Sequence, residues 1–437
     1  MTAVSARPRV LVLSSVPVGR RMIGAAIRPY ELARGLSRDA DVVLAMPAAP
    51  DEPASGVETA VFSHQDPRAL VPLVRWADAV VTQPQWPLIT RLLRRSGTRI
   101  VLDLYVPEPL ELLEAHATRR PVIRRAWQAL SLDRHVAGLR IAHHVVCASE
   151  GQRDLWLGTL LGRRALTPEL YDRDPRLRSQ LAVVPIGLPE QPPRAQPGAG
   201  IREAFPALGA GDEIVLWNGG IWEWLDAPTA VKAVHRLRRA RPRARLVFMG
   251  RGTHQAEVRA TAEVEALARE LGELDDGVFV NDGWVPYDQR GTWLLEADAA
   301  ISCHADHLET RFAFRTRLTD CLWAGLPVVC TAGDELAARI ARDDFGAVVG
   351  ERDAAAAAAA LAGVLERGRG AYAARMQAAA ADYAWPRVVA PIRDWLQDEL
   401  PPRLGGARMP GEALRDGGYV TARTALNVIG LRDWPGG

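Results

Sequence analysis

The sequence predicts an α/β fold with two Rossmann-like domains, each built on a parallel β-sheet. Short apolar runs recur along the chain and alternate with stretches of helical pattern, which is typical of βαβ units. A proline- and glycine-rich stretch at residues 185–211 interrupts this series, and the pattern then starts again. A chain of 437 residues has room for two or three domains of about 150 residues. Two open sheets that face each other would place a ligand cleft between their carboxyl ends.

The first domain is expected over residues 1–190, followed by a linker over residues 191–211. The apolar run RVLVLSS predicts the first strand, and a helix at about residues 27–37 follows it. Later runs such as DAVVTQ contain valine, which favours strands. The predicted strands of this domain are residues 9–15, 41–46, 59–62, 78–83, 99–104, 143–149 and 181–186.

The second domain is expected over residues 212–384, where the same alternation restarts with EIVLWNGG. A single amphipathic helix is expected at residues 385–400, crossing back to the first domain, and an irregular tail at residues 401–437. The predicted strands are residues 213–220, 245–252, 277–285, 298–304, 326–333 and 345–350, and the predicted helices are residues 227–240, 255–271, 354–360 and 371–383.

Bulk composition excludes several classes of function. The formal charge of +2 gives no electrostatic case for nucleic acid. The four cysteines lie in apolar runs without metal-ligand spacing, so we expect reduced core residues and no metal site. No apolar run approaches the roughly 20 residues of a membrane span, and the N-terminal run is too short for a signal peptide. These features indicate a cytoplasmic protein with at most peripheral contact with the inner membrane face; they do not indicate an oligomeric state.

The stretch FRTRLTDCLWAGLPVVC, residues 314–330, places charge directly before a buried strand. At helical spacing its apolar side chains fall on one side, while Arg317 and Asp320 share another side with Ala324. One interpretation is a salt-bridged surface; the other is a ligand site with a cation, a carboxylate and room beside them.

Several motifs, taken in order, resemble one family. Residues 317–329 end in GLPVV after a charged helix, and the segment ADAAISCHADHLETRF precedes them. CASEGQRDLW, AVVPIGLPEQPP and YAWPRVV lie where the family has its serine–glutamate step, its interdomain crossing and its C-terminal tryptophan helix. Over about residues 8–400 the chain is thus similar to GT-B glycosyltransferases, and among them to the retaining glycosyltransferase family 4.

The resemblance implies a nucleoside-diphosphate-sugar donor bound by the second domain. The family carries an arginine and a lysine for the diphosphate after its NGG motif, whereas this chain has IWEWLD there, so Arg315 and Arg317 are the expected substitutes. Asp320 lies over the family's second glutamate and would accept the ribose hydroxyls. Glu309 is the carboxylate near the displaced first glutamate and would be the catalytic residue at the sugar.

Four glycines follow the first strands of the two domains, where the family brings backbone close to the diphosphate. They are Gly19, Gly24, Gly219 and Gly220. Glycine permits such an approach because it has no Cβ, although plain turns would also explain them.

The acceptor side is expected to include Asp103, Tyr105 and His304. His304 and His307 are not spaced like the helical histidine pair of zinc hydrolases, so a sugar-contacting or solvated loop is the expectation. The basic segment 118–135 is either a solvated helix beside the acceptor or a helix of the type that lipid-acceptor enzymes place on membranes.

The resemblance therefore implies a retaining transferase that moves a sugar to a glycan, natural-product or lipid-linked acceptor. The donor is a substrate, so no cofactor is expected. The alternative is a non-catalytic nucleotide-sugar-binding protein or partner subunit that kept the fold.

Overall fold

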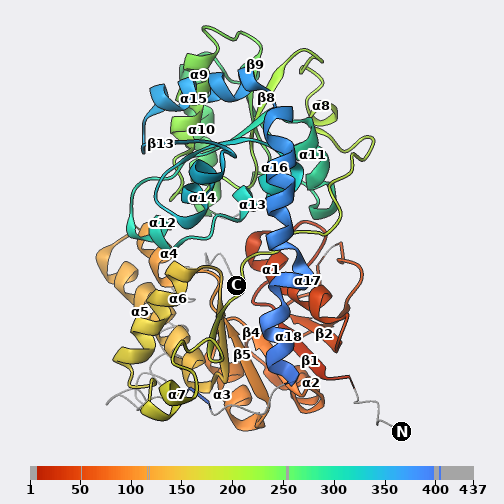
Figure 1. The fold of residues 1–437 in the computed structure, drawn as a ribbon, viewed down its shortest axis with the longest axis vertical. Helices are drawn as coiled ribbons and strands as arrows, with labels where there is room; N and C mark the ends of the chain where they lie inside the picture. Colours follow the sequence, from red (N-terminus) through yellow and green to blue (C-terminus); the bar gives the residue numbers. More distant parts are fainter. Residues whose placement is uncertain are drawn as a thin grey trace. The chain divides into compact units, whose positions relative to one another are not determined.

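The computed structural model describes residues 7–50, 52–115, 117, 119–251, 255–397 and 403–404 (Figure 1). The chain forms two compact units. The first contains the described residues up to Pro185 and those from Trp385 onward, and the second contains Ile186–Ala384.

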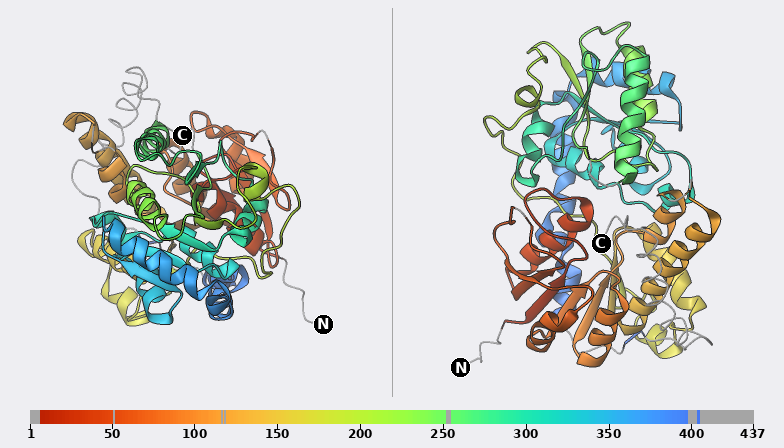
Figure 2. Two further views of the ribbon diagram at one scale, coloured as in Figure 1. Left: turned by 90° about the horizontal axis from the view of Figure 1, so that it is seen from above. Right: turned by 180° about the vertical axis from the view of Figure 1, so that it is seen from behind.

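The first unit is built on a seven-stranded parallel sheet with the order β3-β2-β1-β4-β5-β6-β7. Its central strands are buried along most of their length, because helices cover both faces of the sheet (Figure 2). Strand order reverses between β1 and β4, so the topological switch point lies there. The strands are β1 (Arg9–Leu13), β2 (Asp41–Met46), β3 (Glu58–Val61), β4 (Ala79–Thr82), β5 (Arg99–Asp103), β6 (His144–Cys147) and β7 (Leu181–Val183).

Helices of the first unit connect these strands and return at the end of the chain. They are α1 (Gly24–Leu36), α2 (Leu70–Trp76), α3 (Pro87–Ser96), α4 (Glu108–Ala115), α5 (Pro121–Ile141), α6 (Glu150–Gly162), α7 (Pro168–Arg173), α17 (Trp385–Val388) and α18 (Ala390–Gln397), with the 3₁₀ helix η1 at Pro67–Ala69.

The second unit is built on a six-stranded parallel sheet with the order β10-β9-β8-β11-β12-β13. Its switch point lies between β8 and β11. Trp217 and Phe248 are fully buried and pack against each other at the ends of two neighbouring strands. The strands are β8 (Glu213–Trp217), β9 (Ala244–Phe248), β10 (Val278–Val280), β11 (Ala299–Ser302), β12 (Val328–Thr331) and β13 (Gly346–Val349).

Helices again follow each strand of the second unit. They are α8 (Ile201–Ala204), α9 (Ala227–Leu237), α10 (Gln255–Glu270), α11 (Arg290–Glu296), α12 (Leu308–Phe312), α13 (Thr316–Ala324), α14 (Glu335–Asp343), α15 (Ala354–Arg367) and α16 (Gly370–Ala380), with 3₁₀ helices η2 (Tyr287–Gln289) and η3 (Ala381–Tyr383).

The predicted fold class is confirmed, and every predicted strand corresponds to an observed one. The stretch expected as a linker, residues 191–211, is instead part of the second unit. Trp323 Nε1 donates to the Gln191 carbonyl at 2.7 Å, and Ile201 in α8 is fully buried. This proline-rich stretch is therefore irregular backbone that is hydrogen-bonded to α11 and α13, and it does not form a linker between the two units.

The helix expected at residues 385–400 is divided into α17 and α18 within its described part. Pro391 lacks an N–H donor and its ring collides with the carbonyl four residues earlier, so a helix cannot continue through it. The second helix accordingly begins at Ala390, directly before this proline. Of the expected tail, Arg403 and Leu404 are described and the remaining residues lie outside the described part of the chain.

Candidate functional site

The candidate site lies at the carboxyl edge of the second sheet, where β8, β11 and β12 end. Arg317, in the first turn of α13, reaches the loop after β8 and donates from Nη2 to the Gly220 carbonyl at 3.3 Å. Asn218 donates from its amide to the Arg317 carbonyl at 2.7 Å. These contacts bring the predicted donor residues Gly219, Gly220 and Arg317 together.

The guanidinium of Arg317 is a half-buried cation that no described carboxylate neutralises. Its carbon lies 5.1 Å from the centre of the Trp217 ring, and Nη1 is buried without a hydrogen-bond partner among the described residues. Burial, reinforced by the nearby Arg315 cation, lowers the pKa of Arg317 to about 10, so it remains protonated at neutral pH. A buried charge with unused hydrogen-bonding capacity favours an anionic ligand.

Arg315 has a different environment, and the structure does not support its predicted role at the diphosphate. Its side chain is fully buried and pairs with Asp334, with 2.5 Å between Nε and Oδ2. Nη1 donates to the Thr331 carbonyl at 2.9 Å, and Asp334 caps the N-terminus of α14. The arginine therefore joins the end of β12 to α14, and its donors are used within the protein.

His304 follows β11 and is buried beside the two arginines. Its backbone N–H donates to Thr331 Oγ1 at 2.9 Å, whereas ring atom Nδ1 has no hydrogen-bond partner among the described residues. Burial, followed by the charges of Arg315 and Arg317, lowers the pKa of His304 well below its usual range. His304 is thus a neutral imidazole in the second unit, beside Arg315 and Arg317.

Glu309 is buried in α12, next to a histidine that fixes the neighbouring loop. His307 caps this helix: its Nδ1 accepts from the Thr310 N–H at 3.2 Å, so the ring proton lies on Nε2. That nitrogen donates to the Trp224 carbonyl at 3.2 Å and ties the loop after β8 to α12. Oε2 of Glu309 lies 3.7 Å from His307 Nδ1.

Asp320, the predicted ribose residue, forms an ion pair with Arg290 instead of Arg317. Oδ1 lies 3.4 Å from Arg290 Nε, and the Arg290 guanidinium lies over the rings of Tyr287 and Trp323, 3.7 and 4.7 Å from their centres. Burial raises the pKa of the Asp320 carboxyl, and Arg290 opposes this rise. Sequence reasoning missed Arg290 because it precedes Asp320 by 30 positions, outside any local pattern.

The predicted acceptor residue Asp103 is occupied by a buried ion pair in the first unit. Arg28 donates to both carboxylate oxygens of Asp103 at 2.9 Å. Arg28 also donates to the Pro185 carbonyl at 2.7 Å. Both side chains are almost fully buried. The geometry therefore assigns Asp103 to the interior, where it joins α1 to the end of β5, and does not support a contact with the acceptor.

The predicted residues Gly19, Gly24 and Tyr105 lie in the first unit. A Cβ at position 19 would lie 2.7 Å from the Glu52 carbonyl, so close packing between two loops is sufficient reason for that glycine. Gly24 is the first residue of α1, and a Cβ there would lie 3.9 Å from the hydroxyl of the buried Tyr105. Gly24 and Tyr105 are therefore neighbours.

Two glutamines at the switch point of the first sheet were not predicted. Gln83 and Gln85 directly follow β4, and Ser15, which follows β1, donates to Gln83 Oε1 at 2.8 Å. Both polar atoms of the Gln85 side-chain amide, Oε1 and Nε2, and Nε2 of Gln83 are buried without hydrogen-bond partners among the described residues. In the sequence these glutamines belong to TQPQ, residues 82–85, which overlaps and follows the end of the predicted strand 78–83. Amides of this kind can both donate to and accept from a hydroxyl.

Comparisons with known proteins agree with this architecture. Residues 212–367 match the model of a family described as Glycosyl transferases group 1. The resemblance to GT-B glycosyltransferases is confirmed. A comparison with curated protein sequences found no match.

Solved GT-B structures share the fold at low sequence identity. Sucrose-phosphate synthase from Thermosynechococcus elongatus has a TM-score of 0.57 at 17% identity, covering 96% of this chain and 100% of that one. HepE from Anabaena, solved with UDP and glucose, has a TM-score of 0.65 at 14% identity, covering 89% and 99%. A trehalose 6-phosphate synthase from Burkholderia multivorans has a TM-score of 0.57 at 14% identity, covering 90% and 98%.

The loop after β8 departs from the basic pattern expected of GT-B donor sites. Gly219 has a φ of 128°, which favours glycine. Trp222 and Trp224 then stack with ring centres 4.9 Å apart, and Glu223 pairs with Arg259. This loop carries aromatic side chains where basic ones are expected. In this chain the positive charge at the same edge of the sheet is that of Arg317 in α13.

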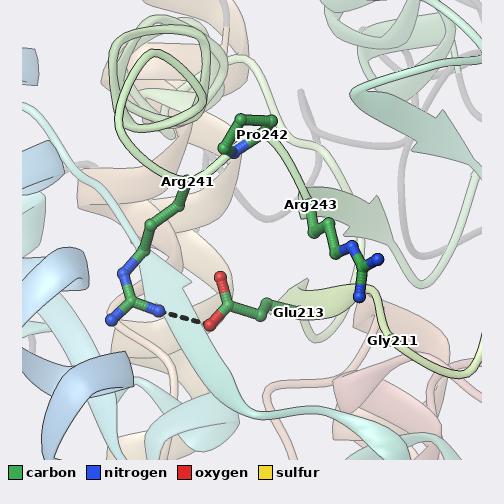
Figure 3. A pocket seen from close by; sticks show the side chains of 5 residues that line it. All are labelled: Gly211, Glu213, Arg241, Pro242 and Arg243. Atoms are coloured by element: carbon green, nitrogen blue, oxygen red, sulfur yellow. Dashed lines mark hydrogen bonds and ion pairs between the residues drawn. The ribbon is translucent and has the colours of Figure 1, made fainter.

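A surface pocket lies at the opposite, amino edge of the second sheet (Figure 3). Gly211, Glu213, Arg241, Pro242 and Arg243 line it, and Arg241 forms an ion pair with Glu213. Ligands of open parallel sheets bind at the carboxyl edge, so this pocket is not the candidate site. Within the described ranges, no group of histidine, cysteine or acidic side chains could hold a metal ion, and no helix is long and apolar enough to span a membrane.

Proposed function

We propose that the protein transfers a sugar from a nucleoside-diphosphate sugar to an acceptor hydroxyl, with retention at the anomeric carbon. The observation that supports the proposal is Arg317, a half-buried cation at the carboxyl edge of the second sheet that has no carboxylate partner among the described residues. A diphosphate supplies the missing negative charge and accepts from the planar guanidinium in a bidentate manner.

The other residues follow from this placement. Asp320 lies one helical turn after Arg317 in α13, where its carboxylate can accept from the ribose hydroxyls while Arg290 holds it in position. Glu309 and the neutral His304 would meet the donor sugar. In a retaining reaction the leaving diphosphate can take the acceptor proton, so the proposal requires no separate enzymic base.

The donor to test first is UDP-glucose, because HepE, which shares the fold, was solved with UDP and glucose. For the acceptor, the buried amides of Gln83 and Gln85 favour a hydroxyl group, as in a glycan, a natural product or a lipid-linked sugar. The test is release of UDP from UDP-glucose in the presence of candidate acceptors. Tight donor binding without any consumption would favour a nucleotide-sugar-binding protein instead.

Asp320→Asn should weaken UDP binding by about 1.5–3 kcal/mol, the scale of a hydrogen bond to a charged group. The amide keeps the shape of the side chain but loses one acceptor and the negative charge. Calorimetric titration measures the change, and Asp282→Asn, which alters an exposed carboxylate of the same unit, is the control. Equal UDP affinity for the wild type and Asp320→Asn would rule out the ribose assignment.

Glu309→Gln should reduce turnover more than donor affinity. A carboxylate near the sugar helps most as positive charge develops at the anomeric carbon, and this charge exists in the transition state rather than in the bound donor. The measurement is kcat beside the dissociation constant of the donor. A parallel loss in both quantities would make Glu309 a binding residue only.

A further inference from the structure

The loops after β1, β3 and β4 meet at the carboxyl edge of the first sheet, where the strand order reverses. Ser15, after β1, donates to Gln83 Oε1 at 2.8 Å, and Gln83 directly follows β4. His64, after β3, has its Nε2 3.4 Å from the Ser15 carbonyl. Its ring meets the Trp86 ring edge to face, with 6.1 Å between the centres. These contacts join the loops at the place where open parallel sheets bind ligands.

Gln85 lies between these residues with both polar atoms of its side-chain amide unpaired in the described part of the chain. Its backbone carbonyl accepts from Thr90 Oγ1 at 3.0 Å, which fixes the chain where α3 begins. The residue is only 4% exposed. A buried amide without partners costs free energy, so a native structure rarely keeps one without a reason. A ligand that pairs with both atoms would supply that reason.

The amide of Gln83 adds a second donor at the same edge. Ser15 occupies its Oε1, whereas Nε2 is buried and has no hydrogen-bond partner within the described ranges. An amide oxygen accepts hydrogen bonds and an amide nitrogen donates them. The two glutamines together therefore offer a ligand one acceptor and two donors.

The buried arginines near these loops have carboxylate partners, in contrast to Arg317 in the second unit. Arg134 lies over the Trp86 ring, 4.7 Å from its centre, and donates to Glu108 at 2.6 Å. Arg28 pairs with Asp103 at the end of β5, the strand next to β4. Since both cations are already neutralised, a phosphate would lose its hydration here without gaining a counter-charge. Neutral amides in this setting favour an uncharged ligand.

We propose that Gln83 and Gln85 select an acceptor that presents two adjacent hydroxyl groups on an uncharged sugar ring. One hydroxyl donates to Gln85 Oε1 and its neighbour accepts from Gln85 Nε2, because adjacent hydroxyls present a donor and an acceptor side by side, as the amide does. Gln83 Nε2 donates to a further oxygen of the same sugar. Glycans and lipid-linked sugars with a free diol are thus favoured over natural products with an isolated hydroxyl. The inference rests on the proposed function, in which the first unit binds the acceptor.

Binding of simple sugars to the full chain, with and without UDP, tests the proposal. The probes are the methyl glycosides of glucose, galactose, mannose and rhamnose, measured by saturation-transfer NMR. At least one should bind, and replacing either hydroxyl of the recognised pair by hydrogen should weaken its binding at least fivefold, because one amide atom is left unpaired. Binding of none of the four probes would overturn the proposal. So would tighter binding of a probe's 6-phosphate, or equal binding of every deoxy analogue.

Variants of the glutamines test the same contacts from the side of the protein. Gln85→Leu should weaken binding of the probe about twentyfold and Gln83→Leu about fivefold, since each hydrogen bond contributes about fivefold. Gln85→Leu should not lower the thermal midpoint, because it removes a buried amide that has no partner among the described residues. A glutamine with only a structural role would give the opposite pattern, a lower midpoint with unchanged binding.

The matched control is Gln180→Leu. Gln180 is a buried glutamine that precedes β7, at the amino edge of the same sheet. Its Oε1 accepts from Ser179, and its Nε2 has no partner in the part of the chain that the structure describes. This variant should bind the probe as the wild type does, and equal losses in Gln180→Leu and Gln85→Leu would overturn the proposal.

Release of UDP from UDP-glucose, with the bound glycoside as acceptor, separates this inference from the proposed function. Transfer that is equal in the wild type and Gln85→Leu would overturn the acceptor assignment and leave the transferase standing. Sugar binding that depends on Gln85, without consumption of any donor, would contradict the transferase and leave the diol site standing.

Discussion

Arg317→Ala should lower the affinity for nucleoside diphosphates by about 3 kcal/mol, roughly a hundredfold, and leave the affinity for the nucleoside unchanged. The guanidinium lies beside Trp217, and its buried Nη1 has no hydrogen-bond partner among the described residues. The diphosphate is therefore the partner that the variant loses. Calorimetric titration of UDP and of uridine measures both affinities.

Two further variants distinguish binding from structure at this position. Arg317→Lys keeps the charge but loses the planar fork, so it should recover only part of the affinity. Arg317→Met should not lower the thermal midpoint of the ligand-free protein, because burial without a carboxylate already disfavours the charged form. Arg311→Ala, at an exposed arginine of α12, is the control. Equal loss of UDP and uridine affinity in Arg317→Ala would contradict the phosphate assignment.

Asp103→Ala should lower the free energy of unfolding by about 3–5 kcal/mol, because it leaves the buried Arg28 cation without its carboxylate. The double variant Arg28→Met/Asp103→Leu should recover much of this loss, since it removes both charges together. Urea unfolding of the three proteins measures the effect. If Asp103→Ala kept full stability and lost only transfer to the acceptor, the original acceptor assignment would be restored.

The two sheets could be predicted from the sequence because parallel strands are buried on both faces. Such strands appear as continuous apolar runs, and β8, β11 and β12 each have this form. The glycine and proline that follow α13 similarly mark its end, and Gly325 adopts a φ of 61° there. Both signals are local, so one sequence carries them.

The partners of charged side chains could not be predicted in the same way. Asp103 and Arg28 are 75 positions apart, and Asp320 and Arg290 are 30 apart. Periodicity indicates which side of a helix a charge occupies but not which distant residue meets it. Arg315 and Arg317, two positions apart, were therefore equivalent in the sequence, although one is paired with Asp334 and the other is not.

The central claim is that the carboxyl edge of the second sheet binds the nucleoside diphosphate. Hydrogen exchange of the full chain, with and without saturating UDP, GDP or ADP, tests it most directly. We expect one of these ligands to protect residues 217–222, 303–309 and 315–320. Protection confined to the opposite edge, around Gly211 and Arg243, or no protection by any of the three ligands, would contradict the account.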